Sequence, residues 1–465
     1  MAKIKTAFFC QGCGYRSSKW LGRCPDCGEW NSLLEEAIHP TESPSNMDAW
    51  TAPGPVGKNP PQAIPLSAID ISSDPRIETG SHEFDRVLGG GVVAGSVILI
   101  GGDPGIGKST LILQSVHHLG NKAEKVLYVS GEESAGQIRL RADRLQIKSD
   151  HLFVLAETAY EEILGHALKL EPRAIVIDSI QTVYTRKVSA APGSVSQIRE
   201  VATQLMYYAK RLGTAVFIIG HVTKSGAIAG PRILEHIVDT VLYFEGGKDH
   251  PYRILRGVKN RFGPVNELGV FEMKGAGLLE VANPSGLFLT ERPKHAAGSV
   301  VVATQEGSRP MLVELQALVS GSHLGSARRM ALGVDPNRVS LLLAILEKRA
   351  GMHLADQDVF INVVSGIQID EPAIDLGILA AAVSSFRDRP IDPETIVFGE
   401  VGLAGEVRGV QQAARRIREA EKMGFTRCIL PQRNTLALKE EKPEGIIMDL
   451  IGVSRIDEVL EVLSD

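Results

Sequence analysis

The chain has 465 residues, of which 44% are hydrophobic and 23% are charged, and its formal net charge is −5. This length allows roughly two to four domains with sizeable cores, and the composition is typical of soluble globular proteins. The net charge excludes little, because local clustering of Lys and Arg matters more for a nucleic-acid partner than the total. No apolar run approaches the roughly 18 residues of a membrane span and no signal peptide opens the chain, so we expect a cytoplasmic protein.

Four of the five cysteines form two C-x-x-C pairs near the amino terminus. Cys10 pairs with Cys13 and Cys24 with Cys27, and ten residues separate the two pairs. Two such pairs in a short segment are typical of a zinc ribbon with four thiolate ligands. Disulfides and a redox pair are the alternatives, but a reducing compartment disfavours disulfides and a redox site needs only one pair. We therefore expect residues 1–35 to fold around Zn²⁺.

Residues 36–65 are rich in Pro, Ser and Asn, which predicts an extended linker. From 66 to 285 apolar strands alternate with helical patterns, which indicates an α/β domain with a mainly parallel sheet. The helices expected from apolar spacing include Thr158–Leu170 and Ser196–Leu212. The expected strands are Val97–Ile100, Val126–Val129, Ala174–Ile177, Ala215–Ile219 and Thr240–Phe244.

A glycine-rich segment directly follows the first of these strands and fits the pattern G-x-x-x-x-G-K-[ST]. Strand, glycine loop and helix form the context in which this pattern binds nucleoside triphosphates. Glycines let backbone N–H groups close around the phosphates, Lys108 would reach the β- and γ-phosphates, and the Ser109 hydroxyl would bind Mg²⁺. We call this segment the phosphate cradle; its residues are Gly102, Asp103, Pro104, Gly105, Ile106, Gly107, Lys108, Ser109 and Thr110.

Acidic residues follow two later strands. Asp178 ends a buried strand in the arrangement that holds Mg²⁺ through its water shell. Glu132 and Glu133 follow a neighbouring strand, at the sheet edge where open α/β sheets bind ligands. We expect Glu132 to polarise the attacking water and Glu133 to be solvated.

Together these features resemble the RecA-like core of RecA recombinases and DnaB-type replicative helicases. The segment Lys259-Asn260-Arg261-Phe262-Gly263 is similar to the K-N-R-F-G element of the bacterial RadA (Sms) family. The four-cysteine ribbon, the phosphate cradle, the strand acid and this element occur in the same order in that family. The resemblance covers essentially the whole chain, and the combination of motifs is highly specific.

The resemblance implies a role for Lys259 and Arg261, since DnaB-type helicases carry basic residues that reach the ATP of the neighbouring subunit. Because Lys259 and Arg261 are two residues apart on the expected strand, their side chains would face the same side of the sheet. A solvated strand edge is the simpler interpretation. Cations that a neighbouring subunit supplies as arginine fingers raise the rate of hydrolysis by a factor of about 10³–10⁵. That geometry requires a ring or a filament.

RecA-like proteins project two loops toward DNA, and the corresponding candidates here are Thr185–Val195 and Thr223–Arg232. The second loop is rich in glycine and carries Lys224 and Arg232 near its ends, which suits sequence-independent contact with single-stranded phosphates. An ordinary surface loop is the alternative. His221, just before this loop, is expected either to sense the γ-phosphate or to be a core histidine.

Residues 286–465 form a second α/β domain in this interpretation, and they resemble the Lon protease domain, as RadA proteins do. The expected elements are paired strands at Ser299–Thr304 and Met311–Leu315, strands at Phe360–Val364, Val397–Phe398 and Cys428–Leu430, and helices over 335–349, Ala373–Ser385 and Val410–Lys422. Cys428 lies in an apolar run, which favours a core position.

The Lon resemblance also predicts that both catalytic residues of the protease are replaced. Aligning the motifs puts Ala373 at the position of the nucleophilic serine and Ala414 at that of the general-base lysine. A methyl group neither attacks a carbonyl nor accepts a proton, so we expect a proteolytically inactive scaffold. Its cations, such as Arg328, Arg338 and Arg416, are expected mainly on solvated helix faces, with lining of a ring as the alternative for some of them.

The sequence and the resemblance together predict an ATP hydrolase that depends on single-stranded DNA and on Mg²⁺. It would be a homohexameric ring helicase or branch-migration factor that processes recombination intermediates in DNA repair with the RecA recombinase. Motifs alone leave hexamer and filament open, and the Lon-like domain favours the hexamer. A nucleotide-switched DNA-binding module and an ATP-dependent protease are the alternatives.

Overall fold

The computed structural model describes residues 5–10, 15–26, 28, 30–38, 65, 76–121, 124–221, 231–246, 251–322, 327–364, 366–441 and 446–463. The chain forms two compact units, Met1–Glu280 and Val281–Asp465. Within the described ranges, no helix has both the length and the apolar character needed to cross a membrane.

The amino-terminal segment forms a small antiparallel sheet in the order β2-β1-β3. Its strands are β1 (Lys5–Cys10), β2 (Arg16–Ser17) and β3 (Leu33–Ile38). Cys10, Cys24 and Leu33 are buried together in its interior. With such a small core, this segment needs a further source of stability.

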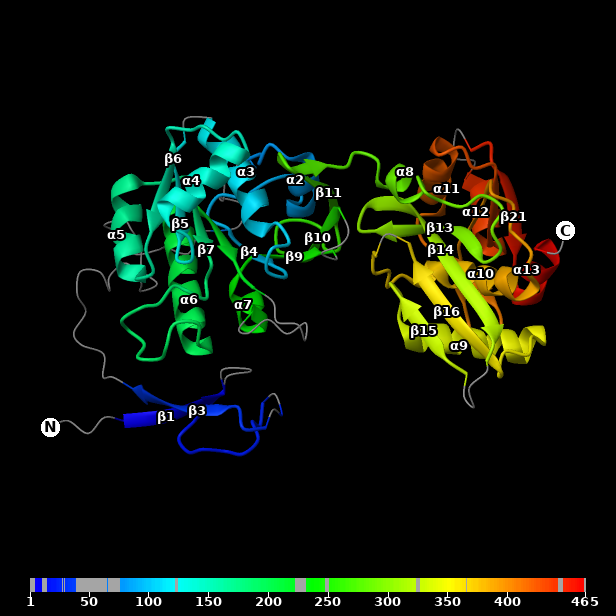
Figure 1. The fold of residues 1–465 in the computed structure, drawn as a ribbon, viewed down its shortest axis with the longest axis horizontal. Helices are drawn as coiled ribbons and strands as arrows, with labels where there is room; N and C mark the ends of the chain where they lie inside the picture. The colour runs from blue at the N-terminus through cyan, green and yellow to red at the C-terminus, as the bar shows by residue number, and fades with distance from the viewer. Residues whose placement is uncertain are drawn as a thin grey trace. The chain divides into compact units, whose positions relative to one another are not determined.

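The rest of the first unit is built on a nine-stranded sheet, counted over the described residues, in the order β12-β11-β10-β9-β4-β8-β7-β5-β6 (Figure 1). From β9 to β6 neighbouring strands pair in parallel, and β10, β11 and β12 extend the sheet antiparallel. The expected mainly parallel α/β fold is confirmed. The strands are β4 (Val97–Gly101), β5 (Val126–Ser130), β6 (Leu152–Ala156), β7 (Ala174–Asp178), β8 (Ala215–Ile219), β9 (Thr240–Glu245), β10 (Tyr252–Asn260), β11 (Leu268–Lys274) and β12 (Gly277–Glu280).

Helices cover both faces of this sheet, because its central strands are apolar on both sides. Ile98 and Ile100 of β4 pack in one core with α3, whereas Val97 and Leu99 pack in another with α6. Such continuous apolar runs are typical of parallel strands buried on both faces. The helices are α2 (His82–Leu88), α3 (Lys108–Asn121), α4 (Ala135–Arg144), α5 (Tyr160–Leu170), α6 (Val195–Leu212) and α7 (Pro231–Ile237).

All five strands expected in this unit are present. The strands β11 and β12 were not expected, and neither was β6. Strand β6 lies at the end of the sheet, and Phe153 and Val154 within it are exposed. Its sequence, LFVLA, is apolar throughout, as in the central strands, so this run was a signal for a strand that the prediction missed.

The second unit contains a seven-stranded mixed sheet, again counted over the described part, in the order β15-β16-β14-β13-β17-β20-β21. The expected pairing of its first two strands is confirmed as the antiparallel pair β13 and β14. The strands are β13 (Ser299–Glu306), β14 (Arg309–Gly321), β15 (Arg329–Leu332), β16 (Gln357–Val363), β17 (Thr395–Val397), β20 (Arg427–Pro431) and β21 (Asp449–Val453); β18 (Glu400–Val401) and β19 (Val407–Arg408) form a separate pair.

The three expected helices of this unit are also present, and their ends follow local chemistry. In α9, the Asp335 side chain accepts a hydrogen bond from the Asn337 N–H, Pro336 takes the first helical position, and Gly351 ends the helix in a left-handed conformation. The helical elements are α8 (Pro284–Phe288), α9 (Pro336–Ala350), η2 (Pro372–Ile374), α10 (Asp375–Arg387), α11 (Ala413–Lys422), α12 (Gln432–Glu441) and α13 (Ile456–Val462).

Candidate functional site

The phosphate cradle lies between the carboxyl end of β4 and the first turn of α3. Gly102 and Gly107 have φ angles of 148° and 120°, which disfavour any side chain. A Cβ atom at Gly102 would also lie 2.9 Å from Cβ of Phe244 and 3.1 Å from its carbonyl oxygen. The backbone must therefore be glycine here, and it leaves the N–H groups at the start of α3 available to an anion.

Lys108 is buried in the cradle, with 4% of its surface exposed. Its Nζ donates to the carbonyls of Gly102 at 2.7 Å and Asp103 at 2.9 Å. Burial lowers the pKa of Lys108 to about 8, although the charges of Asp178, Asp103 and Glu132 act in the opposite direction. The ammonium is thus held at the site where the sequence predicts terminal phosphates.

Asp178 ends β7 on the face of the sheet that packs against α3, and 8% of it is exposed. Its Oδ2 accepts a hydrogen bond from the Tyr128 hydroxyl at 2.5 Å. The Asp178 carboxylate and the Ser109 hydroxyl are hard oxygen donors of the kind that Mg²⁺ prefers, so the residues present fit this ion. Tyr128 was not predicted as a site residue, because a tyrosine on a buried strand looks like an ordinary core residue.

Glu132 and His221 come together beside Lys108. Nε2 of His221 lies 3.1 Å from Oε1 of Glu132, and its Nδ1 lies 3.4 Å from Nζ of Lys108. The Ser179 hydroxyl donates to the same oxygen of Glu132. The segments that follow β5 and β7 can lie this close because residue 131 is glycine. A Cβ atom there would lie 2.1 Å from Oγ1 of Thr182. His221 therefore contacts the site and is not a core histidine.

The expectation that Glu133 is solvated is wrong. Its carboxylate forms an ion pair with Arg141 of α4, and about two-thirds of each side chain or more is covered. Ser134 caps the same helix with a reciprocal capping box, so the Glu133 backbone is held where α4 begins. This pairing leaves Glu132 as the carboxylate that faces the cradle.

Lys259 and Arg261 lie at the opposite edge of the same sheet. Lys259 pairs with Val241 near the start of β9, whereas Gly101, which precedes the cradle, pairs with Tyr243 further along that strand. The two positions on β9 therefore differ by two residues, and parallel strands rise about 3.3 Å per residue. The cradle leaves the carboxyl edge of the sheet, so neither cation faces the cradle of its own subunit.

Lys259 does not extend into solvent, which the simpler interpretation had assumed. Its Nζ donates to the carbonyls of Glu235, in α7, and of Val238, at 2.8 Å in the latter case. Burial and the charge of Arg261 lower the pKa of Lys259. Arg261 forms a 3.5 Å ion pair with Asp239 while its side chain stays 54% exposed.

Comparisons with known proteins agree with this geometry. Residues 66–227 match the model of an AAA domain, and 8–35 match that of a rubredoxin metal-binding domain. Residues 336–434 match the model of subunit ChlI of Mg-chelatase. The chain is 53% identical to the DNA repair protein RadA of Halalkalibacterium halodurans over 462 residues, 99% of each chain. It is 53% identical to DNA repair protein RadA of Bacillus subtilis over 460 residues (99% of each) and 51% identical to that of Pseudomonas aeruginosa over 463 residues (100% of each).

The chain belongs to the RadA family of DNA repair proteins. Its AAA domain contains the phosphate cradle, Glu132 and Asp178, and ends before Lys259. ATP and Mg²⁺ are the ligands that such a domain implies.

In this RadA-family chain, the metal-binding model covers all four cysteines of the ribbon. Cys10 and Cys24 are buried. The Cys10 N–H donates to Tyr15 O, and the Gly28 N–H donates to Cys24 O, both at 2.9 Å. Cys13 and Cys27 lie outside the described residues. The buried thiols fit Zn²⁺, which binds sulfur well.

We expect Cys10→Ser to release zinc from the ribbon and to unfold residues 1–35. Metal binding in small zinc folds is worth about 10–16 kcal/mol, which is effectively their folding free energy. ATP hydrolysis by the sheet domain should survive. Zinc content, measured with a colorimetric chelator, checks this, with the exposed change Ser18→Ala as the control. Stoichiometric zinc in Cys10→Ser protein would contradict the four-thiolate assignment.

The structure describes the candidate DNA loop at Thr185–Val195 but little of the one at Thr223–Arg232. Lys224 lies outside the described residues, and nothing is described of the Arg232 side chain. The loop at Thr185–Val195 is tied to the domain, since Nε2 of Gln197 donates to the carbonyls of Thr185, Val188 and Ala190. This loop is therefore anchored along much of its length.

The two positions that align with the nucleophilic serine and the general-base lysine of Lon are occupied by apolar side chains. Ala373 lies in η2 and is 2% exposed, and Ala414 is partly buried in α11. Cys428 is fully buried, as expected, and burial raises the pKa of its thiol well above the ordinary value.

Arg416, expected on a solvated face, is fully buried, so that expectation is wrong. It forms an ion pair with Glu371 and donates to the carbonyl of Ala303 at 2.7 Å. Arg338 is likewise paired with the buried Asp375, whereas Arg415 is exposed. Partners that are distant in the sequence decide which of these cations are buried.

We expect Arg416→Met to destabilise the second unit by about 3 kcal/mol, because it leaves the Glu371 carboxylate, whose side chain is only 23% exposed, without its cation. The matched change Arg415→Met, one residue away on an exposed position, should cost less than about 0.5 kcal/mol. Urea unfolding followed by circular dichroism measures both. Equal effects of the two changes would contradict the buried ion pair.

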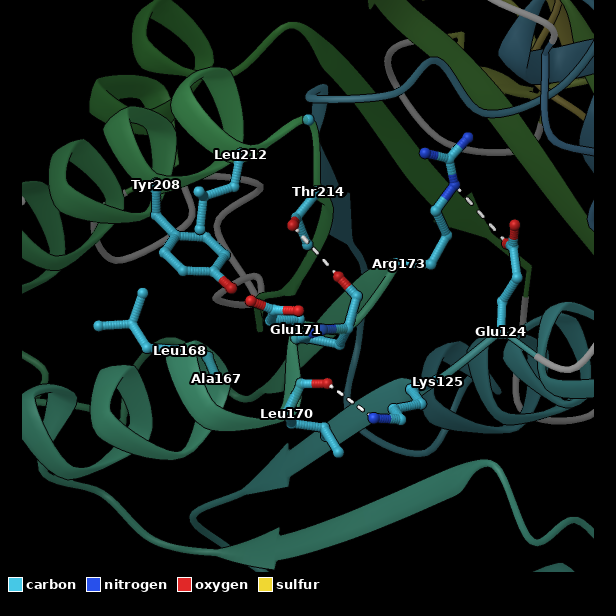
Figure 2. A pocket seen from close by; sticks show the side chains of 12 residues that line it. Glu124, Lys125, Ala167, Leu168, Leu170, Glu171, Arg173, Tyr208, Leu212 and Thr214 are labelled. Carbon is cyan, nitrogen blue, oxygen red and sulfur yellow. Dashed lines mark hydrogen bonds and ion pairs between the residues drawn. The ribbon is translucent and has the colours of Figure 1, made fainter. Parts of the chain in front are cut away.

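A separate pocket of about 780 Å³ lies at the amino-terminal edge of β5, β7 and β8. Tyr208 and Leu212 from α6 and Leu168 from α5 line it, and charged side chains, among them Glu171 and Arg173, surround it (Figure 2). The phosphate cradle is at the carboxyl-terminal edge of the same strands. The pocket is therefore distinct from the nucleotide site.

Proposed function

We propose that this chain is an ATP hydrolase whose turnover depends on single-stranded DNA. In this proposal it acts as a ring helicase or branch-migration factor that processes recombination intermediates during DNA repair. Support comes from the family name of the relatives, DNA repair protein RadA, and from the AAA domain. Work on chromosomal DNA would place it in the cytoplasm.

The observation that carries the proposal is the convergence of Lys108, Asp178, Glu132 and His221 at one edge of the sheet. In the proposed mechanism the cradle N–H groups and Lys108 bind the β- and γ-phosphates. Asp178 and Ser109 would hold Mg²⁺, which would neutralise charge on the phosphates. Glu132 accepts a proton from the attacking water while Ser179 and His221 hold its carboxylate in place.

Lys259 and Arg261 extend the proposal to an assembly. They are remote from their own cradle, so a direct role in hydrolysis requires the cradle of a neighbouring subunit. A homohexameric ring provides that arrangement, and the carboxyl-terminal domain, proposed as an inactive Lon-like scaffold over 286–465, would support it. The ribbon (1–35), linker (36–65) and ATPase domain (66–285) complete this proposed organisation. The recombinase RecA is the proposed protein partner.

Stimulation of ATP hydrolysis by single-stranded DNA, together with strand displacement on forked DNA, tests this function. A module that only switches its DNA affinity with nucleotide would bind DNA but show neither stimulation nor displacement. Glu132, held by both Ser179 and His221, favours turnover over switching. The protease alternative is opposed by the methyl groups at Ala373 and Ala414, which supply neither a nucleophile nor a base.

We expect Lys224→Ala and Arg232→Ala to weaken single-strand binding similarly for all sequences, because phosphates would be the recognised groups. The salt slope should fall by about 0.7 per lost phosphate contact. Basal ATP hydrolysis should persist while its stimulation by DNA falls. Binding titrations at several salt concentrations measure this; an unchanged slope with full stimulation would move the DNA path elsewhere.

A further inference from the structure

Tyr128 makes a specific contact with the acid at the end of β7. Ser130, at the end of β5, is the register partner of Asp178, and Tyr128 lies two residues earlier on the same face of the sheet. A diagonal neighbour of this kind is within reach of a long aromatic side chain. The Tyr128 hydroxyl reaches Oδ2 of Asp178 at 2.5 Å, and only 1% of the tyrosine is exposed.

This contact leaves the two oxygens of Asp178 unequal. A carboxylate that accepts a hydrogen bond at one oxygen is restrained in its rotation, and its other oxygen stays available to a ligand. The Tyr128 hydroxyl is the donor of this hydrogen bond, because an ionised carboxylate only accepts.

We propose that Tyr128 is a positioning residue, which holds the Asp178 carboxylate in the orientation that receives Mg²⁺ and its water shell together with the nucleotide. This inference rests on the proposed ATPase function and deepens it. Groups that orient metal-binding side chains typically contribute about 10- to 100-fold to metal affinity or activity when they are removed. Tyr128 would act in this way without touching the ion or the nucleotide.

The test is Tyr128→Phe, which removes one hydroxyl and keeps the ring that fills the core. Binding of a fluorescent ATP analogue is titrated with Mg²⁺ and, separately, in EDTA. We expect the variant to need about tenfold more Mg²⁺ for half of the Mg²⁺-dependent gain in affinity. Affinity in EDTA should match that of the unmodified protein, because the cradle and Lys108 are unchanged.

Tyr208→Phe is the matched control, since Tyr208 is also a buried tyrosine of this domain but lines the pocket at the opposite edge of the sheet (Figure 2). It should leave the Mg²⁺ titration unchanged. Asp178→Asn should lose the Mg²⁺-dependent gain, and adding Tyr128→Phe to it should cause no further loss, since both changes act on one group.

An unchanged Mg²⁺ requirement in Tyr128→Phe would overturn the inference. Equal weakening with Mg²⁺ and in EDTA, or loss of folding in thermal melts, would also overturn it, because either result indicates a general structural role. Failure of the proposed function is separate: analogue binding that survived Lys108→Ala would reject the cradle itself, whatever Tyr128 does.

Discussion

Replacement of Lys108 by alanine is expected to abolish ATP hydrolysis and to remove most of the affinity for ATP. Lys108 is the buried cation of the cradle, held by the Gly102 and Asp103 carbonyls at 2.7 and 2.9 Å. Binding of triphosphate would give its ammonium stronger, charged acceptors. Removing a preorganised donor of this kind lowers kcat by about 10²–10³ or more.

ATPase assays and equilibrium titration with ATP measure the two effects of Lys108→Ala. Lys125→Ala is a suitable control, because that lysine lies at the opposite edge of the sheet and its Nζ donates only weakly, at 3.4 Å, to Leu170 O. The control should keep normal turnover. Normal turnover in Lys108→Ala protein would mean that the cradle is not the active site.

Lys259→Ala and Arg261→Ala are expected to keep ATP binding and assembly but to lose turnover by about 10³-fold or more. The reason is their position at the edge of the sheet away from their own cradle, from which they would complete the site of a neighbour. Arg261→Ala is the cleaner variant. Asp239, its partner, keeps a 2.7 Å ion pair with Lys210 and a bond from the Val97 N–H at 3.0 Å. Lys259→Ala also removes bonds to carbonyls at and just beyond α7.

Mixing supplies the decisive measurement for these variants. Arg261→Ala protein mixed with Lys108→Ala protein should recover part of the activity, because some sites then combine an intact cradle with an intact Arg261. Lys274→Ala, on the neighbouring strand β11 and 52% exposed, should behave like the unmodified protein. If mixed assemblies form and no activity returns, the two residues do not complete a shared site.

Much of the domain organisation could be predicted from the sequence, because several features depend only on short stretches of it. The apolar run 97–100, the glycines after it and the following helix indicate the cradle, since each depends on local backbone preferences. Two C-x-x-C pairs indicate the ribbon for the same reason. The strand endings at Glu132 and Asp178 also follow from local pattern, because parallel strands bring their carboxyl ends to one edge.

Other features depended on which strands became neighbours, and periodicity does not carry that information. Tyr128 reaches Asp178 only because β5 pairs with β7 in one register. Arg416 is buried because Glu371, distant in the sequence, lies beside it. Lys259 bonds to carbonyls at the end of α7 and just beyond it, and Glu133 to Arg141, so neither is the solvated side chain that charge alone suggests. The sequence by itself determined the strand, loop and helix that bind phosphate, because local geometry suffices for them. Only the tertiary structure decided the partners of these charged and hydroxyl groups, because burial and pairing depend on contacts between distant segments.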